Sequence, residues 1–135
     1  MSLPESIHLE IVTPERHLLM TPASSVVVPA SEGEMEILDG HTPLMSSLKT
    51  GVLSFYNAGS ETKLMVSGGF VQVELHRVTI LCESAALPDE VDAPELRKKL
   101  DELREQLAAL STDDPNLKRV TLEMERALIS LDIAK

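Results

Sequence analysis

The chain has 135 residues, and 22 acidic against 12 basic side chains give it a formal net charge of −10. A surface of this sign repels phosphate backbones, and an aromatic content of 2% leaves few side chains for bases to stack on, so we expect no nucleic-acid partner. The longest apolar runs are only a few residues, and no basic stretch with an apolar segment opens the chain, so we expect no membrane insertion and no targeting segment.

Residues 1–88 are predicted to form an antiparallel β-sandwich or flattened barrel. All six glycines lie in this part, together with most of the Val, Ile and Thr residues. Short strand-like segments recur there at roughly 8–12-residue spacing. The strands that we expect span Ile7–Ile11, Ser25–Val28 (stopped by Pro29), Val52–Tyr56, Lys63–Val66, Phe70–Val73 and Arg77–Glu83. Tight turns are expected at residues 57–60 and 74–76.

Residues 89–135 are predicted to form an antiparallel hairpin of two α-helices. Asp92 sits three residues before Glu95, which is typical of a helix N-terminus, and Pro94 is tolerated in a first turn. The first helix carries a leucine seam at residues 96, 100, 103, 107 and 110. The second helix is expected to restart at Asp114-Pro115, with an apolar stripe at residues 117, 120, 124, 127, 128 and 131.

So short a hairpin cannot enclose a large core of its own. Its stability therefore depends on what it docks against. Docking on its own sandwich and docking on a partner can then differ by only a few kcal/mol, which is the condition for a conformational switch.

Few residues suggest chemistry. The four histidines form no metal-ligand pattern with cysteine or carboxylates, so we expect no metal site. Cys82 lies among core-pattern neighbours without a nearby base, which favours a buried, inert thiol. Ser67-Gly68-Gly69 precedes a strand rather than a helix, so it indicates positive φ or a close approach of other backbone rather than a phosphate loop. We expect no catalytic residue and no cofactor.

An acidic segment lies between the second and third predicted strands. Glu32, Glu34, Glu36 and Asp39 are punctuated by glycines, but they lack the spacing of a calcium loop. They form either a solvated edge or a docking edge for a basic partner. His41 follows in a Gly-His-x-Pro turn, where its imidazole either bonds to loop carbonyls or contacts a partner.

Two motifs carry a family resemblance. Ser31–Leu44 reads SEGEMEILDGHTPL, and Ser67–Val73 reads SGGFVQV. The first resembles SEGELGI-x-PGH-x-PL of the epsilon subunit of the F-type ATP synthase, and the second motif and the two-helix tail follow in the same order and spacing. Glu36 stands where the family usually has Gly, and Asp39 where it often has Pro.

The resemblance implies a central-stalk subunit that binds gamma and the polar loops of the c-ring, and couples proton flow to ATP synthesis. Its location would be peripheral, on the cytoplasmic face of a bacterial inner membrane. By resemblance, Glu34 is the best c-ring contact, and Glu32, Asp39 and His41 are further candidates. The extended hairpin would reach the catalytic alpha and beta subunits through basic residues, among them Arg97, Arg119 and Arg126, and restrain ATP hydrolysis.

Some members of this family bind ATP between the two helices, through a motif of the form [IL]-D-x-x-R-A. Here Arg97 lies five residues after Asp92 instead of three, and Pro94 intrudes. On the second helix Arg126 matches a family arginine, but Ser130 stands where a second is usual. We therefore expect weak ATP binding or none.

Two other classes of function are alternatives to this one. A free-standing adaptor or chaperone-like module would use the same acidic edge and hairpin for an unrelated partner. An enzyme would need a polar pocket with a paired acid and base, and the sequence offers no such pair.

Overall fold

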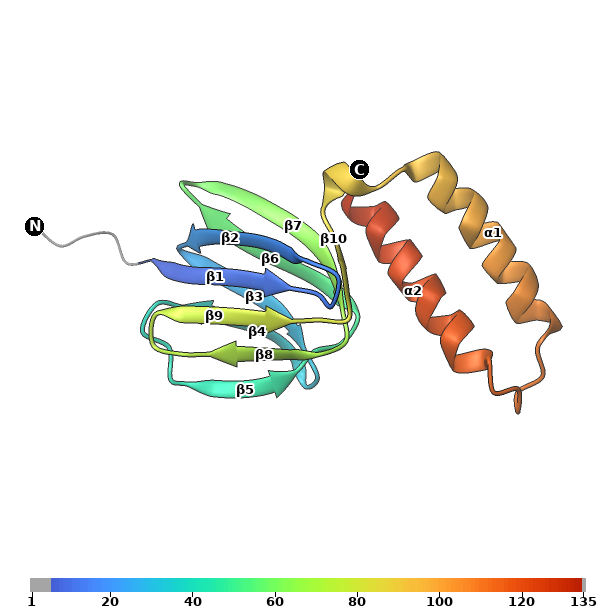
Figure 1. The fold of residues 1–135 in the computed structure, drawn as a ribbon, viewed down its shortest axis with the longest axis horizontal. Coiled ribbons are helices and arrows are strands. Elements are labelled where there is room, and N and C mark those ends of the chain that lie inside the picture. Colours follow the sequence, from blue (N-terminus) through green and yellow to red (C-terminus); the bar gives the residue numbers. More distant parts are fainter. Residues whose placement is uncertain (1–5, 135) are drawn as a thin grey trace, which may run out of the picture.

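The computed structural model describes residues 6–134, which form two packed β-sheets followed by a helical hairpin (Figure 1). The strands are β1 (Ile7–Val12), β2 (His17–Ala23), β3 (Ser25–Ala30), β4 (Gly33–Leu38), β5 (Leu44–Ser47), β6 (Gly51–Asn57), β7 (Ser60–Ser67), β8 (Phe70–Val73), β9 (Arg77–Leu81) and β10 (Ser84–Ala86). A short 3-10 helix, η1 (Pro88–Glu90), leads to α1 (Ala93–Ala109) and α2 (Leu117–Ile133). The predicted class, a β-sandwich followed by a helical hairpin, is confirmed.

The two sheets have the strand orders β2-β1-β9-β8-β5 and β10-β7-β6-β3-β4. Neighbouring strands are antiparallel except for β1 and β9, which pair in parallel. Alternate side chains point between the sheets and form one apolar core. Its buried members are Ile7, Leu9, Ile11, Ala23, Val26, Val28, Ala30, Ile37, Leu48, Leu53, Phe55, Leu64, Val66, Val71, Val73, Val78, Ile80 and Cys82.

Four strands, β2, β4, β5 and β10, were not predicted. Each of them is an edge strand of its sheet, so it pairs along one side only. The residues of β2, β5 and β10 are mostly half-buried or exposed, which leaves a weak apolar alternation in the sequence. In β4, Glu34 and Glu36 do alternate with Met35 and Ile37, but the glycines on either side favour a loop. Pro29 also does not stop β3, since the strand continues to Ala30 and Pro29 pairs with Glu34 of β4.

The first helix of the hairpin starts at a capping residue. The carboxylate of Asp92 accepts a hydrogen bond from the backbone N–H of Glu95 at 3.2 Å, as expected of an N-cap. The second helix starts at Leu117, later than predicted, because residues 114–116 form a turn in which Asp114 Oδ1 accepts from the N–H of Asn116.

Burial within the hairpin is sparse. Leu100 and Leu103 are the buried leucines of the predicted seam on α1, and Val120 and Ala127 are buried on α2. Leu128, predicted to belong to the apolar stripe, is exposed instead, and Ser130 is buried in its place. Of the two helices, α2 lies against the sandwich at β7 and β6, while α1 lies on its far side (Figure 1).

An ion pair ties the linker between the two parts to the sandwich. Arg16, in the turn after β1, lies 2.5 Å from a carboxylate oxygen of Glu90 in η1. Glu90 also accepts the backbone N–H of Leu87 at 2.9 Å. Burial opposes ionisation of Glu90, but the Leu87 N–H and the Arg16 guanidinium outweigh it and lower the pKa of this carboxyl. The linker up to Glu90 therefore belongs with the sandwich.

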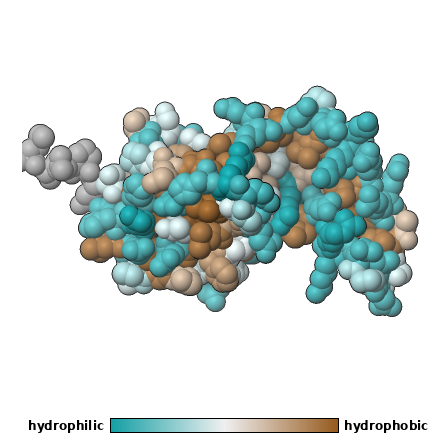
Figure 2. All heavy atoms as spheres, in the orientation of Figure 1, coloured by the Kyte–Doolittle hydropathy of each residue, from teal (hydrophilic) through white to brown (hydrophobic). Residues whose placement is uncertain are grey.

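The outer face of the sheet that contains β1, β8 and β9 carries apolar residues. Figure 2 shows brown residues among teal ones on this face, and a mostly teal surface on the hairpin. Phe70 and Leu81 are exposed neighbours across β8 and β9, and Met45 on β5 is exposed near them.

The glycine pair after β7 makes a tight crossing between the sheets. Both residues have positive φ, +71° at Gly68 and +96° at Gly69, as the sequence predicted. A Cβ on Gly69 would lie 1.9 Å from the carbonyl oxygen of Leu81, and one on Gly68 would meet the Glu83 side chain. Two chain segments therefore approach here more closely than any side chain allows.

We predict that Gly69→Ala lowers the free energy of unfolding by about 3 kcal/mol or more, because strain at positive φ adds to the clash with backbone. Gly59→Ala is the matched control: Gly59 also has positive φ (+81°), but nothing lies within 4 Å of its added Cβ. That variant should lose about 1 kcal/mol. Urea unfolding of both proteins measures the difference, and equal losses would show that the crossing tolerates a side chain.

Candidate functional site

The acidic segment forms an edge strand with its turn. β4 is the last strand of its sheet, and Glu34 and Glu36 point together away from the core while Ile37 points into it. Glu32 lies in the preceding turn and is exposed, as are Glu34 and Glu36. Acidic side chains on an edge strand discourage pairing with another strand, and they leave their carboxylates available to a basic partner.

The other end of β4 is held to the β8–β9 turn. Asp39 Oδ1 lies 2.9 Å from Nδ1 of His76, and the N–H of Gly40 donates to the carbonyl of Leu75 at 2.8 Å. Only 11% of the Asp39 side chain is exposed, against 69% for His76. The contact fixes the shape of the turn that presents His41.

His41 bonds within its own turn. Its Nδ1–H donates to the carbonyl of Thr42 at 2.7 Å, and its backbone N–H donates to the carbonyl of Leu38. This is the loop-carbonyl bond considered from the sequence. This bond uses Nδ1 of the imidazole and does not involve Nε2.

The predicted acidic residues do not form one cluster. Glu32 and Asp39 are seven residues apart along a strand, or about 23 Å at 3.3 Å per residue. The Glu32 turn lies at the hairpin end of the sandwich, where the N–H of Ser31 donates to Ser47 and the N–H of Leu48 to Gly69. Asp39 and His41 lie at the opposite end, beside the β8–β9 turn. A partner contacting both must run along the whole edge.

The three basic residues singled out on the hairpin have different surroundings. Arg97 is exposed on α1 and lines an open groove of about 520 Å³ with Leu128 and Asp132. Arg119 pairs with Glu123 at 3.0 Å within α2. Arg126 alone among these three bonds to the sandwich.

The Arg126 guanidinium reaches the end of β7. Its Nε–H donates to Oγ of Ser67 at 2.7 Å, and a terminal nitrogen lies 3.4 Å from a carboxylate oxygen of Glu83. Ser67 is completely buried, and its hydroxyl also bonds to that of Thr50 at 2.7 Å. Ser67 and Glu83 were not predicted to contact the hairpin, and Thr50 was not predicted to support Ser67. The unusual Ser-Gly-Gly run was the one signal that another segment comes close.

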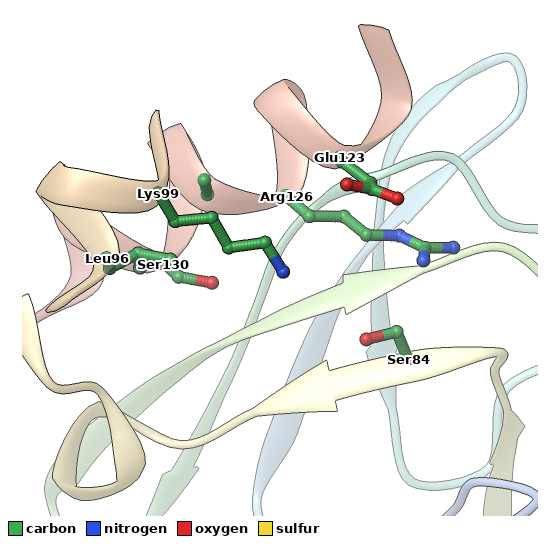
Figure 3. Close-up of a pocket in the computed structure, with 7 residues that line it drawn as sticks. Ser84, Leu96, Lys99, Glu123, Arg126 and Ser130 are labelled. Carbon is green, nitrogen blue, oxygen red and sulfur yellow. The ribbon is translucent and has the colours of Figure 1, made fainter. Parts of the chain in front are cut away.

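A cavity of about 290 Å³ lies between the hairpin and β10. Lys99 from α1 and Arg126 from α2 extend over it towards Ser84, with Glu123 beside Arg126 (Figure 3). Two cations over one hollow suit an anion, but one of them is already bonded to Ser67 and faces Glu83.

The described residues offer little for catalysis. Within residues 6–134 no group of three or more His, Cys, Asp and Glu side chains could hold a metal ion. Burial raises the pKa of the Cys82 thiol to about 11, so it is a poor nucleophile near neutral pH. None of the helices described for this chain is both long and apolar enough to cross a bilayer.

Comparison with known proteins gives consistent matches along the chain. Residues 6–88 match the family model described as ATP synthase, Delta/Epsilon chain, beta-sandwich domain. The chain is 32% identical to the ATP synthase epsilon chain of Geobacter metallireducens over 130 residues, covering 96% of this chain and 94% of that one. It is 40% identical to the epsilon chain of Sinorhizobium fredii over 104 residues, covering 76% and 78%.

A solved structure extends the match to the hairpin. A chain of the Euglena gracilis mitochondrial ATP synthase, determined with OSCP, F1 and the c-ring, superposes with a TM-score of 0.78 at 27% identity. The superposition covers 99% of this chain and 84% of that chain, so it includes the sandwich and both helices. On these matches of sequence and structure, the chain belongs to the family of ATP synthase epsilon chains.

Proposed function

We propose that this chain is a non-catalytic subunit of the ATP synthase central stalk, where it binds gamma and the c-ring and helps to couple proton flow to ATP synthesis. The observation that carries the proposal is the match of the whole chain, at 27% identity, to a protein of an F1 and c-ring assembly. The related epsilon chains named above are bacterial. A peripheral position on the cytoplasmic face of a bacterial inner membrane follows as part of the proposal.

The acidic edge is the proposed contact with the polar loops of the c-ring. Glu34 is exposed and points outward from an edge strand, so its carboxylate can reach a basic side chain without rearrangement. Glu32 continues the same edge. Asp39 and His41 extend the contact at its other end, where the bond between Asp39 and His76 gives the turn its shape.

The helical hairpin is the proposed regulatory part. Its own buried core is small, and several of its basic residues, Arg97, Lys98, Lys99, Arg104, Lys118 and Arg119, are exposed. In an extended position they would face acidic surfaces of the catalytic alpha and beta subunits and restrain ATP hydrolysis. Surface ion pairs of this kind are screened by salt, so the restraint should weaken as ionic strength rises.

Reversal of charge at the edge tests the c-ring contact. We predict that Glu34→Lys loosens coupling in the reassembled complex, because it sets like charges against each other, while the sandwich stays folded. Each exposed pair contributes only about 0–1 kcal/mol, so a partial loss of ATP-driven proton pumping is expected. Glu15→Lys makes the same charge change in the exposed turn between β1 and β2 and should leave pumping unchanged. Equal pumping in all three complexes would reduce Glu34 to a solvated side chain.

Removal of the hairpin tests its regulatory role. A chain ending at Pro88 keeps all ten described strands and should still assemble with gamma and the c-ring. We predict that ATP hydrolysis by that complex rises relative to the full-length protein, since the inhibitory element is gone, while ATP synthesis is largely retained. Identical hydrolysis rates would make the hairpin purely structural.

Nucleotide should bind this chain weakly or not at all. Arg97 lies on the opposite side of α1 from the cavity that Lys99 and Arg126 line, and Ser130 supplies no second positive charge on α2. We predict that titration calorimetry of the isolated protein with ATP gives no binding in the micromolar range. A micromolar dissociation constant would show that Lys99 and Arg126 suffice for the phosphates.

A further inference from the structure

We propose that Arg126 acts as a clasp that holds the hairpin closed against the sandwich through Ser67 and Glu83, without any bound nucleotide. Because the inference concerns the resting position of the hairpin, it rests on the regulatory role proposed above.

The surface beneath α2 mixes polar and apolar side chains. Along β7, Leu64 and Val66 point into the core, so Met65 and Ser67 point outward, and both are buried although they lie on the outer face. Met65 is apolar, and so is Val52, which pairs with it from β6 and lies on the same face. Ser67 is joined by Thr50, and Glu83 and Lys49 lie along the same border. Apolar burial therefore covers only part of this contact, and its polar part depends on hydrogen bonds across it.

Packing on both sides of Arg126 is incomplete. One cavity of about 290 Å³ is bounded by α1, α2 and β10, and another of about 320 Å³ lies between α2 and the segment around Ser67. Arg126 is the one residue, within the part of the chain that the structure describes, that lines both. Its side chain is 25% exposed and spans the space between α2 and the end of β7, which apolar side chains do not fill.

The hydrogen bond at the centre is of a strong type. A guanidinium N–H donates to a completely buried hydroxyl at 2.7 Å, and a charge-assisted bond contributes more than a neutral one. Ser67 keeps its bond to Thr50 when the hairpin leaves, and Glu83 is already 68% exposed. Opening therefore leaves neither Ser67 nor Glu83 buried without a partner, which makes the clasp reversible.

The pivot of the movement is short. Arg16 and the Leu87 N–H hold Glu90 to the sandwich, and α1 starts at Ala93. Val91 and Asp92 are the residues between these two fixed points. When the clasp opens, the hairpin turns about them while the sandwich and η1 stay together.

The test measures the docked and undocked populations of the isolated full-length chain. Spin labels are placed at exposed Ser60 on β7 and exposed Glu102 on α1, in a chain whose buried Cys82 is replaced by Ala, and the distance distribution is recorded by pulsed electron paramagnetic resonance. Arg126→Gln should raise the ratio of undocked to docked molecules about tenfold, as expected for the loss of a charge-assisted bond. Arg119→Gln is the matched control, because that arginine on the same helix pairs within α2. Its ratio should equal that of the parent.

Ser67→Ala provides the second arm. If Arg126 acts through Ser67, Arg126→Gln should add much less in the Ser67→Ala background than in the parent. The assignment is overturned if Arg126→Gln leaves the ratio unchanged, if the two substitutions act additively, or if Arg126→Gln abolishes the cooperative unfolding of the sandwich. Its failure differs from failure of the regulatory role, which is read from hydrolysis by the complex that carries the chain ending at Pro88.

Discussion

The structure depends on the fact that β7 is buried on both faces at its carboxyl end. Leu64 and Val66 fill the core between the sheets, while Met65 and Ser67 lie beneath α2 on the opposite face. One strand therefore supports both the sandwich and the docked hairpin. The two faces differ in chemistry, because the inner one is made of large apolar side chains and the outer one ends in a hydroxyl. The inner face is therefore part of a permanent core, while the outer face makes a hydrogen bond that water can replace.

Much of the fold follows from the sequence because its signals are local. Alternation in Ile7–Ile11 and Arg77–Glu83 marked strands with one face in the core, and β1 and β9 occupy these positions. The caps and leucine spacing of the hairpin were equally local. The edge strand β5 escaped prediction because it is short and half polar, and β4 because glycines flank its alternating residues Glu34 to Ile37 and favour a loop. β4 forms a hairpin with β3, the strand before it, while β5 pairs with β8, which lies more than twenty residues further along the chain.

In the candidate site, too, local properties could be predicted from the sequence and long-range contacts could not. The acidity and exposure of Glu34 followed from composition and spacing within a few residues. The bond from Asp39 to His76 and that from Arg126 to Ser67 join residues that are 37 and 59 positions apart. Charge alone would have made Asp39 and Arg126 free surface groups. The contacts of both residues depend on how the sheets and the hairpin pack together. A short stretch of sequence around either residue does not reveal that packing.

The pairing of the two helices also sets a length scale. With 17 residues and a rise of 1.5 Å each, α1 is about 26 Å long, and α2 returns alongside it. While Leu100 and Leu103 stay packed on α2, no part of the hairpin can therefore extend much beyond 26 Å from the pivot at Val91 and Asp92. A target that lies farther away can be reached only when the helices separate and expose those leucines. The distance of the surface that the hairpin contacts thus decides whether it moves as a rigid lever or comes apart.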